Sequence, residues 1–317
     1  MEERSRTRKD LDDMQRLPLD AKIEMTMQRI REWYKKWDGG VCVSFSGGKD
    51  STVLKHIVDG MYDVPSVFVD TGLEFPEARR FVFEMKDGKH IGFNRNMEII
   101  RPKMRFDEVV KRFGYPVATK DISHKIHAAR NGSERALAFV NGTAVGSNGR
   151  QHRFCVPPRW RSLLDAPFDV SDYCCYVMKE QLFYKSDKWN RPYVGILAEE
   201  SKLRQAAWVK NGCNAYHAKQ TKSAPMAFWT EQDVFRYIVE NRLPYCSIYG
   251  EIRQDDNGRY YTTNAEKTGC MFCMFGVHRD KRPNRFERMK ETHPAQYDYC
   301  MNRLGLREVL DYIGIPY

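Results

Sequence analysis

The chain has 317 residues, of which 42% are hydrophobic, so it is large enough for one or two packed domains. No apolar run is long enough to cross a membrane, and residues 1–9 lack the apolar core of a signal peptide, so we expect a cytoplasmic protein. The formal net charge of +10 suits a polyanionic partner, either nucleotide phosphates or a nucleic-acid backbone.

The N-terminal part is predicted to be helical. Apolar residues recur at helical spacing over residues 19–37, which indicates an amphipathic helix. We therefore assign residues 1–38 to a helical segment that packs on the domain after it. Residues 41–45 are rich in β-forming side chains and predict a buried strand, and a helical pattern begins near Lys49.

The turn between this strand and helix reads Ser-Gly-Gly-Lys-Asp-Ser-Thr over residues 46–52. Gly47 and Gly48 have no Cβ, so backbone N–H groups can approach an anion closely, and the positive end of the helix adds to the attraction. Lys49 adds a charge, and Asp50 requires Mg²⁺ between itself and a phosphate, because a bare carboxylate would repel the ligand. The spacing differs from that of the Walker loop. We predict a phosphate-binding loop in which Lys49 and Asp50 are catalytic. The other predicted ligand contacts of the loop are Ser46, Gly47, Gly48, Ser51 and Thr52.

Strands and helices continue to alternate after this loop, with a strand over residues 65–70, a helix over 77–86 and a strand over 96–100. This order predicts an α/β fold in which a parallel sheet carries helices on both faces. Ligands bind at the carboxyl ends of the strands in such sheets. The residues that end the second strand are therefore added to the predicted ligand site: Asp70, Thr71 and Gly72.

The pattern is less regular in the second half. A helix is predicted over residues 105–114, followed by an exposed insertion over about 115–160, in which residues 131–153 show little periodicity. Residues 191–197 read as a strand, and Thr230 caps a later helix. After the helical segment 1–38, we therefore divide the chain into two parts. Residues 39–215 form a nucleotide-binding domain that contains the insertion, and residues 216–317 form a cysteine-bearing, mainly helical part.

Nine cysteines in a reducing compartment favour thiolate ligands over a disulfide framework. Cys270 and Cys273 form a C-x-x-C turn, while Cys174 and Cys175 are adjacent on a predicted helix. Four thiolates suit zinc or a [4Fe–4S] cluster. The adjacent pair favours the cluster, because neighbouring cysteines close a single zinc tetrahedron poorly; zinc is the alternative. Cys42 lies inside the first strand and is expected in the core. The unassigned cysteines are Cys155, Cys213, Cys246 and Cys300.

With these residues in view, the chain resembles the phosphoadenosine phosphosulfate (PAPS) reductase family along nearly its whole length. It is most similar to short bacterial and prophage members and to the ATP pyrophosphatase of DNA phosphorothioation. The blocks that carry the resemblance occur in order at residues 46–51, 70–76, 174–175, 200–204 and 269–273.

The resemblance implies an adenine-nucleotide α-hydrolase-like fold with a PP-loop that binds ATP or a sulfonucleotide. It implies that residues 70–72 face the nucleotide. Arg204 is implied at its phosphate or sulfate end, and Glu200 and Ser201 are implied as further nucleotide-binding residues. The residues implied as cluster ligands are Cys174, Cys175, Cys270 and Cys273.

Two features depart from the sulfonucleotide reductases. Those enzymes use a nucleophilic cysteine in a C-terminal Glu-Cys-Gly-Leu-His motif, whereas residues 301–317 contain no cysteine and Cys300 lacks the motif. The Ser-Gly-Gly-Lys-Asp-Ser loop is also the form found in enzymes that split ATP between its α- and β-phosphates.

Our hypothesis is therefore an ATP pyrophosphatase that adenylates an acceptor for sulfur transfer. Nucleic acid is a candidate acceptor, as in DNA phosphorothioation, and a cysteine desulfurase or another sulfur donor is a candidate partner. One alternative is a PAPS or adenylyl-sulfate reductase that uses Cys300 or the thiol of a partner. The other is a nucleotide-binding regulatory protein with a structural cluster.

Overall fold

The computed structural model describes residues 6–317. Its contacts divide the chain into two compact units, each built from two separate stretches. The first unit runs to Arg101 and resumes over Gln181–Gly269; the second comprises Pro102–Glu180 and Cys270–Tyr317. The predicted segment 1–38 falls in the first unit, and its residues 1–5 lie outside the described residues.

The first unit contains the α/β sheet. Its elements up to Arg101 are α1 (Arg8–Gln15), α2 (Leu19–Lys36), β1 (Cys42–Ser44), α3 (Lys49–Asp59), β2 (Ser66–Val69), α4 (Pro76–Lys86) and β3 (Met97–Ile100). Those of the returning stretch are α9 (Gln181–Tyr184), β4 (Pro192–Val194), η3 (Ala198–Glu200), α10 (Lys202–Asn211), β5 (Asn214–Ala215), β6 (Lys222–Ser223), α11 (Glu231–Glu240), η4 (Ser247–Tyr249), β7 (Ile252–Gln254) and β8 (Tyr260–Thr262).

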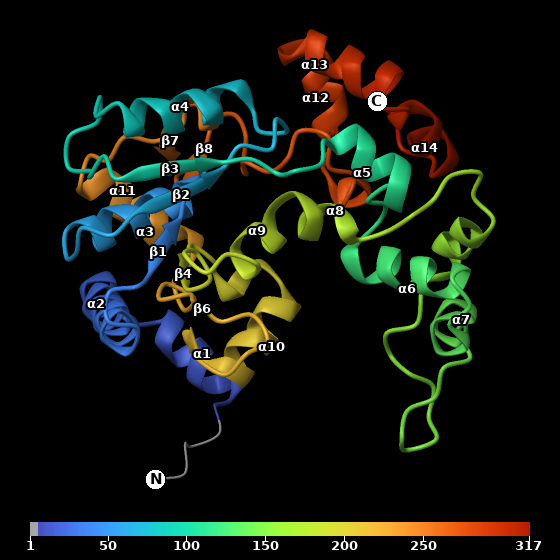
Figure 1. Cartoon of the computed structure of the whole chain (residues 1–317), viewed down its shortest axis with the longest axis horizontal. Helices are drawn as coiled ribbons and strands as arrows, with labels where there is room; N and C mark the ends of the chain where they lie inside the picture. The colour runs from blue at the N-terminus through green and yellow to red at the C-terminus, as the bar shows by residue number, and fades with distance from the viewer. Residues whose placement is uncertain (1–5) are drawn as a thin grey trace. The chain divides into compact units, whose positions relative to one another are not determined.

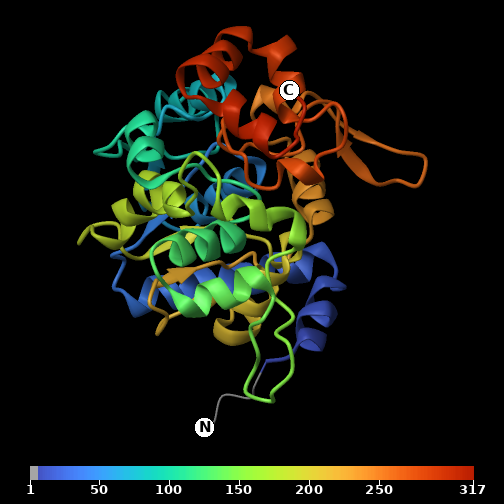
Figure 2. The same ribbon diagram turned by 90° about the vertical axis from the view of Figure 1, so that its right-hand side faces the viewer.

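The described residues of this unit form a six-stranded sheet in the order β3-β2-β1-β4-β6-β5 (Figure 1). Neighbouring strands are parallel except β5 and β6, which are antiparallel, so the predicted α/β class is confirmed. This antiparallel edge was not predicted from the sequence. The strands β7 and β8, which form a separate antiparallel hairpin (Figure 2), were not predicted either.

Apolar residues alternate between the two faces of the sheet, as period-two side chains do. On one face Val43 packs with residues of α2 and α3, and Phe68 packs with residues of α4. On the other face Cys42 and Val67 pack against Phe183 of α9. Helices therefore cover both faces, and Cys42 belongs to the core; both predictions are confirmed.

The second unit is helical. Its elements are α5 (Phe106–Phe113), α6 (Lys120–Arg130), α7 (Glu134–Asn141), η1 (Pro158–Leu164), α8 (Tyr173–Cys175), η2 (Tyr176–Glu180), η5 (Val277–Arg279), α12 (Arg285–Thr292), α13 (Pro294–Asp298), η6 (Tyr299–Arg303) and α14 (Leu306–Tyr312). Nowhere in residues 6–317 is there a helix with the length and apolar character needed to span a bilayer.

Residues 131–153 show little periodicity, and the helix α7 within them was not predicted from the sequence. The side chain of Ser133 caps this helix, and Gly142 ends it in the left-handed conformation. Its buried face is short, with Ala136 and Val140 one turn apart. A single apolar pair is too brief a pattern to be recognised as helical periodicity.

Candidate functional site

The loop over residues 46–52 joins the end of β1 to the start of α3, as the sequence predicted. Gly47 has a φ of +73°, which disfavours any residue with a Cβ. A Cβ on Gly48 would lie 2.7 Å from Oγ1 of Thr268, so a second segment of chain already packs on the loop. The glycines are therefore required by close packing as well as by the turn.

The loop hydroxyls are engaged with the loop itself. Ser51 Oγ and Thr52 Oγ1 donate to the carbonyl oxygen of Gly48 at 2.9 and 3.0 Å. Ser46 Oγ lies 3.0 Å from Ser51 Oγ. These bonds hold the first turn of α3, whose N-cap residue Gly48 has no side chain with which to cap it.

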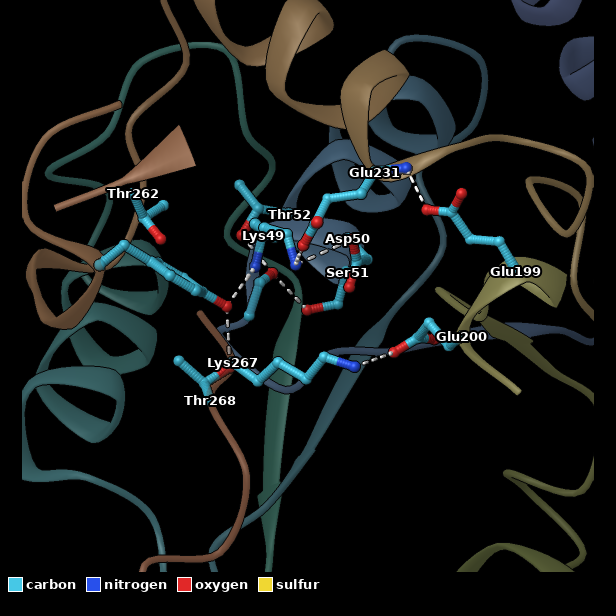
Figure 3. A network of polar contacts seen from close by, with 12 residues as sticks. Lys49, Asp50, Ser51, Thr52, Glu199, Glu200, Glu231, Thr262, Lys267 and Thr268 are labelled. Atoms are coloured by element: carbon cyan, nitrogen blue, oxygen red, sulfur yellow. Dashed lines mark hydrogen bonds and ion pairs between the residues drawn. The ribbon is translucent and has the colours of Figure 1, made fainter. Parts of the chain in front are cut away.

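Lys49 is the central cation of the site, with its side chain only 5% exposed. Its Nζ lies 3.1 Å from Glu231 Oε1 and 3.7 Å from Asp50 Oδ1 (Figure 3). Burial lowers the pKa of Lys49, but the charges of Asp50, Tyr249 and Glu231 outweigh burial and the net pKa is raised. The ammonium group therefore stays protonated and is held by carboxylates.

Tyr249 and Asp50 complete the surroundings of this cation. The backbone N–H of Lys49 donates to Tyr249 Oη at 3.1 Å, and that oxygen lies 3.0 Å from Thr268 Oγ1. Burial raises the pKa of Asp50 against the opposing charge of Lys49. Asp50 Oδ1 has no hydrogen-bond partner among residues 6–317. Such a buried, unsatisfied carboxylate oxygen is a free coordination or hydrogen-bonding position.

A cavity of about 330 Å³ opens beside Lys49 and Asp50. It is lined by Lys49, Asp50, Leu197, Glu199, Glu200, Glu231, Gln232, Arg259 and Lys267. Burial and the nearby carboxylates raise the pKa of Glu199, whose Oε1 accepts from the backbone N–H of Glu231. Across the described part of the chain, no group of three or more His, Cys, Asp or Glu residues is arranged to hold a metal ion. A Mg²⁺ ion would thus take one or two carboxylates here and most of its ligands from a bound phosphate or water.

The structure brings Glu200 to this cavity but leaves Ser201 and Arg204 off its lining. Glu200 forms ion pairs with Arg204 and, at 3.6 Å, with Lys267. Ser201 caps α10 by accepting a hydrogen bond from the Arg204 backbone N–H at 3.2 Å. Burial lowers the pKa of Arg204, with Asp50 opposing.

Asp70, Thr71 and Gly72 follow β2 and also do not line the cavity. The buried carboxylate of Asp70 lies 3.1 Å from Arg79 and 3.2 Å from Arg101. Burial raises the pKa of Asp70, but its bonds with Arg79 and Arg101 more than offset this and the net pKa is lowered. Thr71 Oγ1 donates to Glu74 at 2.8 Å. In this structure Asp70 therefore positions two arginines.

The four cysteines of the predicted cluster all belong to the second unit. Burial, followed by the charges of Cys175, Cys270 and Cys273, raises the pKa of Cys174. Burial and the charge of Cys270 raise the pKa of Cys273 to about 12. The thiols are thus within electrostatic range of one another, and Lys120 lies beside Cys175. They do not form a metal-binding group in the described residues, so the cluster remains a prediction.

Cys300 is fully buried. Its Sγ donates to the carbonyl oxygen of Tyr297 at 3.3 Å, and burial raises the pKa of the thiol to about 12. A reactive cysteine requires an accessible thiolate, so this environment does not activate Cys300.

Several residues of the cavity were not predicted from the sequence. Glu231 lies in a capping box formed by Thr230 and Asp233, and a capping pattern marks the start of a helix and not a contact with Lys49. Glu199 directly precedes a block that the resemblance had singled out. No local pattern marked Tyr249 or Lys267, because packing brings Tyr249 to the loop from 200 residues downstream and Lys267 to Glu200 from 67 residues downstream.

The fold and the loop define a parallel α/β protein of the class that holds its ligands at the carboxyl ends of the strands. The family model described as phosphoadenosine phosphosulfate reductase domain matches residues 40–143 and 157–274. The chain therefore belongs to this family, and membership implies a nucleotide ligand.

Two relatives and one solved structure illustrate the similarity. An uncharacterized protein of Methanocaldococcus jannaschii is 25% identical over 77% of this chain and 38% of its own length. A phosphoadenosine 5'-phosphosulfate reductase of Alkalilimnicola ehrlichii is 25% identical over 71% of each chain. This chain thus spans little more than a third of the first relative. A crystal structure of a phosphoadenylyl-sulfate (PAPS) reductase from Candida auris, in its phosphate complex, has a TM-score of 0.39 and 16% identity, over 74% of this chain and 89% of that one.

Proposed function

We propose that this protein is an ATP pyrophosphatase that binds ATP at residues 46–52 and adenylates an acceptor for sulfur transfer. The observation that carries the proposal is the buried, protonated Lys49, held by Glu231 and Asp50 at the edge of the cavity. A polyphosphate that enters the cavity supplies the negative charge that these carboxylates now provide.

In the proposed reaction an acceptor oxygen forms a bond to the α-phosphorus. The bond from that phosphorus to the oxygen bridging to the β-phosphate breaks, and pyrophosphate leaves. Lys49 offsets charge on the phosphates, and the backbone around Gly47 and Gly48 holds them in place. Mg²⁺, when bound with the nucleotide, would neutralise the leaving pyrophosphate, and the unsatisfied oxygen of Asp50 fits it.

The other predicted nucleotide contacts are part of this proposal. Residues 70–72 are proposed to face the nucleotide, with Asp70 presenting Arg79 and Arg101 as further cations. Arg204 is proposed to exchange its ion pair with Glu200 for the phosphate end of the ligand. Such an exchange is favourable when the ligand interacts with Arg204 more strongly than the carboxylate it replaces.

Cys174, Cys175, Cys270 and Cys273 are proposed to hold a [4Fe–4S] cluster. The influence of these thiols on one another's pKa supports this, because it indicates that they lie near one another, and a bound metal would stabilise them as thiolates.

A PAPS or adenylyl-sulfate reductase is the second candidate. The name of the Alkalilimnicola relative favours it, and the names of the relatives support it more directly than they support an ATP pyrophosphatase. The chemistry of this chain favours the first candidate, because Cys300 is buried with its pKa raised to about 12. A reductase of this sequence would need the thiol of a partner.

The test compares two reactions of the same reconstituted protein. One incubation contains ATP labelled in its γ-phosphate, Mg²⁺ and candidate acceptors; the other contains PAPS or adenylyl sulfate with a thiol reductant. Pyrophosphate formation that requires Lys49 but not Cys300 is the expected result. Sulfite release without any pyrophosphate formation would contradict this proposal and show that the protein is a reductase. Nucleotide binding with neither product would indicate a regulatory protein.

A further inference from the structure

Residues 144–156 lie between the two segments that the family model matches, so this part of the chain is additional to the family domain. The surrounding residues 130–161 contain six arginines and one glutamate, a net charge of +5. One tenth of the chain therefore carries half of its net charge of +10. Solubility alone does not require such a concentration of one sign.

This segment has a defined backbone. The N–H of His152 donates to the Ala144 carbonyl and that of Gly146 to the Arg150 carbonyl, both at 2.8 Å. Between them Val145 and Gln151 form an antiparallel bridge. Figures 1 and 2 show the resulting loop extending from the end of α7. We call residues 144–156 the basic finger.

Packing within the second unit anchors the finger at its base. Lys125 Nζ of α6 donates to the Phe154 carbonyl at 2.6 Å, and the N–H of Val156 donates to the Phe139 carbonyl at 2.9 Å. The ring of Phe139 meets His152 edge to face, at a centroid separation of 4.8 Å. The exposed side chains of the finger are thus presented from a braced support.

The surface of the finger combines arginines that form no salt bridge with an exposed aromatic ring. Arg150 and Arg153 are exposed, as are Arg135 and Arg159 beside the finger. None of the four forms a salt bridge within residues 6–317. The side chain of Phe154 is 68% exposed, although an apolar ring of this size normally buries most of its area.

We propose that the basic finger binds single-stranded nucleic acid. Arginines neutralise backbone phosphates, and an exposed ring offers a stacking surface that an unpaired base can reach and a base pair in a duplex cannot. His152 lies next to the Phe154 ring, at 5.7 Å between centroids and tilted by 50°, and holds one side of it. The inference goes beyond the nucleotide reaction proposed above and does not depend on which reaction the loop performs.

An anionic membrane surface is the competing partner for a basic segment. Binding at a membrane interface requires a continuous apolar face, usually along an amphipathic helix. In the finger Phe154 is flanked by Arg153 and Cys155, and the exposed apolar residue Val145 lies opposite Gln151, which follows Arg150. The apolar surface is therefore interrupted by cations, as in a stacking and phosphate-binding surface.

The test measures binding of the full chain to a labelled single strand of about 20 nucleotides, longer than a typical single-strand site, by fluorescence anisotropy at several salt concentrations. Replacing Arg150 and Arg153 by Gln should reduce the slope of log K against log salt by about 1.4, since each single-strand phosphate contact contributes about 0.7. Phe154→Ala should weaken binding about tenfold and leave that slope unchanged. The matched control is Arg31→Gln with Lys35→Gln, which removes two exposed cations from α2.

Equal losses in the finger variant and the α2 variant would overturn the proposal, because binding would then follow net charge alone. Failure of the wild-type chain to bind the strand at low salt would also overturn it. Stronger binding to duplex of the same length, unaffected by Phe154→Ala, would reject stacking. Binding to vesicles containing anionic lipid that depends on Phe154, without binding to the strand, would assign the surface to a membrane. All variants change exposed residues, so their unfolding midpoints should match that of the wild type.

Discussion

Replacing Gly47 by Ala should destabilise the first unit strongly, and the structure separates two causes. The φ of +73° costs a residue with a Cβ about 1–2 kcal/mol. The new Cβ would also lie 2.9 Å from Val82 Cγ2 and 3.1 Å from the Ala78 carbonyl oxygen. Both atoms belong to α4, and forcing a methyl group into such a packed position costs about 1–3 kcal/mol. The expected total is about 2–5 kcal/mol, a large part of the usual stability of a domain.

Gly258 provides a matched control. It has the same φ of +73°, but a Cβ there would have no atom within 4 Å. Gly258→Ala should therefore cost only the backbone term, about 1–2 kcal/mol. The difference between the two variants, about 1–3 kcal/mol, measures how closely the loop packs on α4.

Urea denaturation followed by tryptophan fluorescence is a suitable assay, because five of the six tryptophans lie in the first unit. Nucleotide affinity, measured by calorimetry under native conditions, should fall in Gly47→Ala and stay unchanged in Gly258→Ala. Equal loss of stability in the two variants would refute the packing argument. Unchanged nucleotide affinity in a folded Gly47→Ala protein would refute the assignment of the loop.

Four further outcomes are expected. Lys49→Ala should lower turnover on the order of 10²-fold or more, with a smaller effect on nucleotide affinity; equal losses in both would contradict its role in the reaction. Cys300→Ser should leave turnover nearly unchanged, because the thiol is buried and its pKa is raised to about 12. Cys174→Ser should abolish the visible absorption of anaerobically purified protein, whereas a colourless wild-type protein with stoichiometric zinc would exclude the iron cluster. The pKa of Asp70 is lowered in the folded state. The Asp70 carboxylate therefore stabilises the fold above its unfolded pKa of about 3.9, and this stabilisation is lost as the pH falls through the lower, folded pKa. Asp70→Asn should therefore flatten the stability profile below about pH 4, and an unchanged acid limb would argue against the arginine pairs.

Much of the first unit was predictable because its signals are local. The strand before residue 46, the glycine turn and the helix after Lys49 are adjacent in the chain, and each has its own period or conformational requirement. The cap at Thr230 was likewise recognised from neighbouring residues. Alternation of such elements then predicted a parallel sheet, since connections between parallel strands follow few topologies. The antiparallel pairing of β5 with β6 was not predicted, because each of these strands is only two residues long.

The surroundings of Lys49 required the tertiary structure. Glu231 and Tyr249 reach this lysine from positions about 180 and 200 residues downstream, and neither contact leaves a periodic or spacing signal. Burial also changes chemistry in ways that residue type alone does not reveal: the cysteine considered as an alternative nucleophile, Cys300, has no access to solvent. The residues themselves thus determined the loop and its charge. Packing decided which carboxylates neutralise that charge, because the partners of a buried ion are selected by the whole fold.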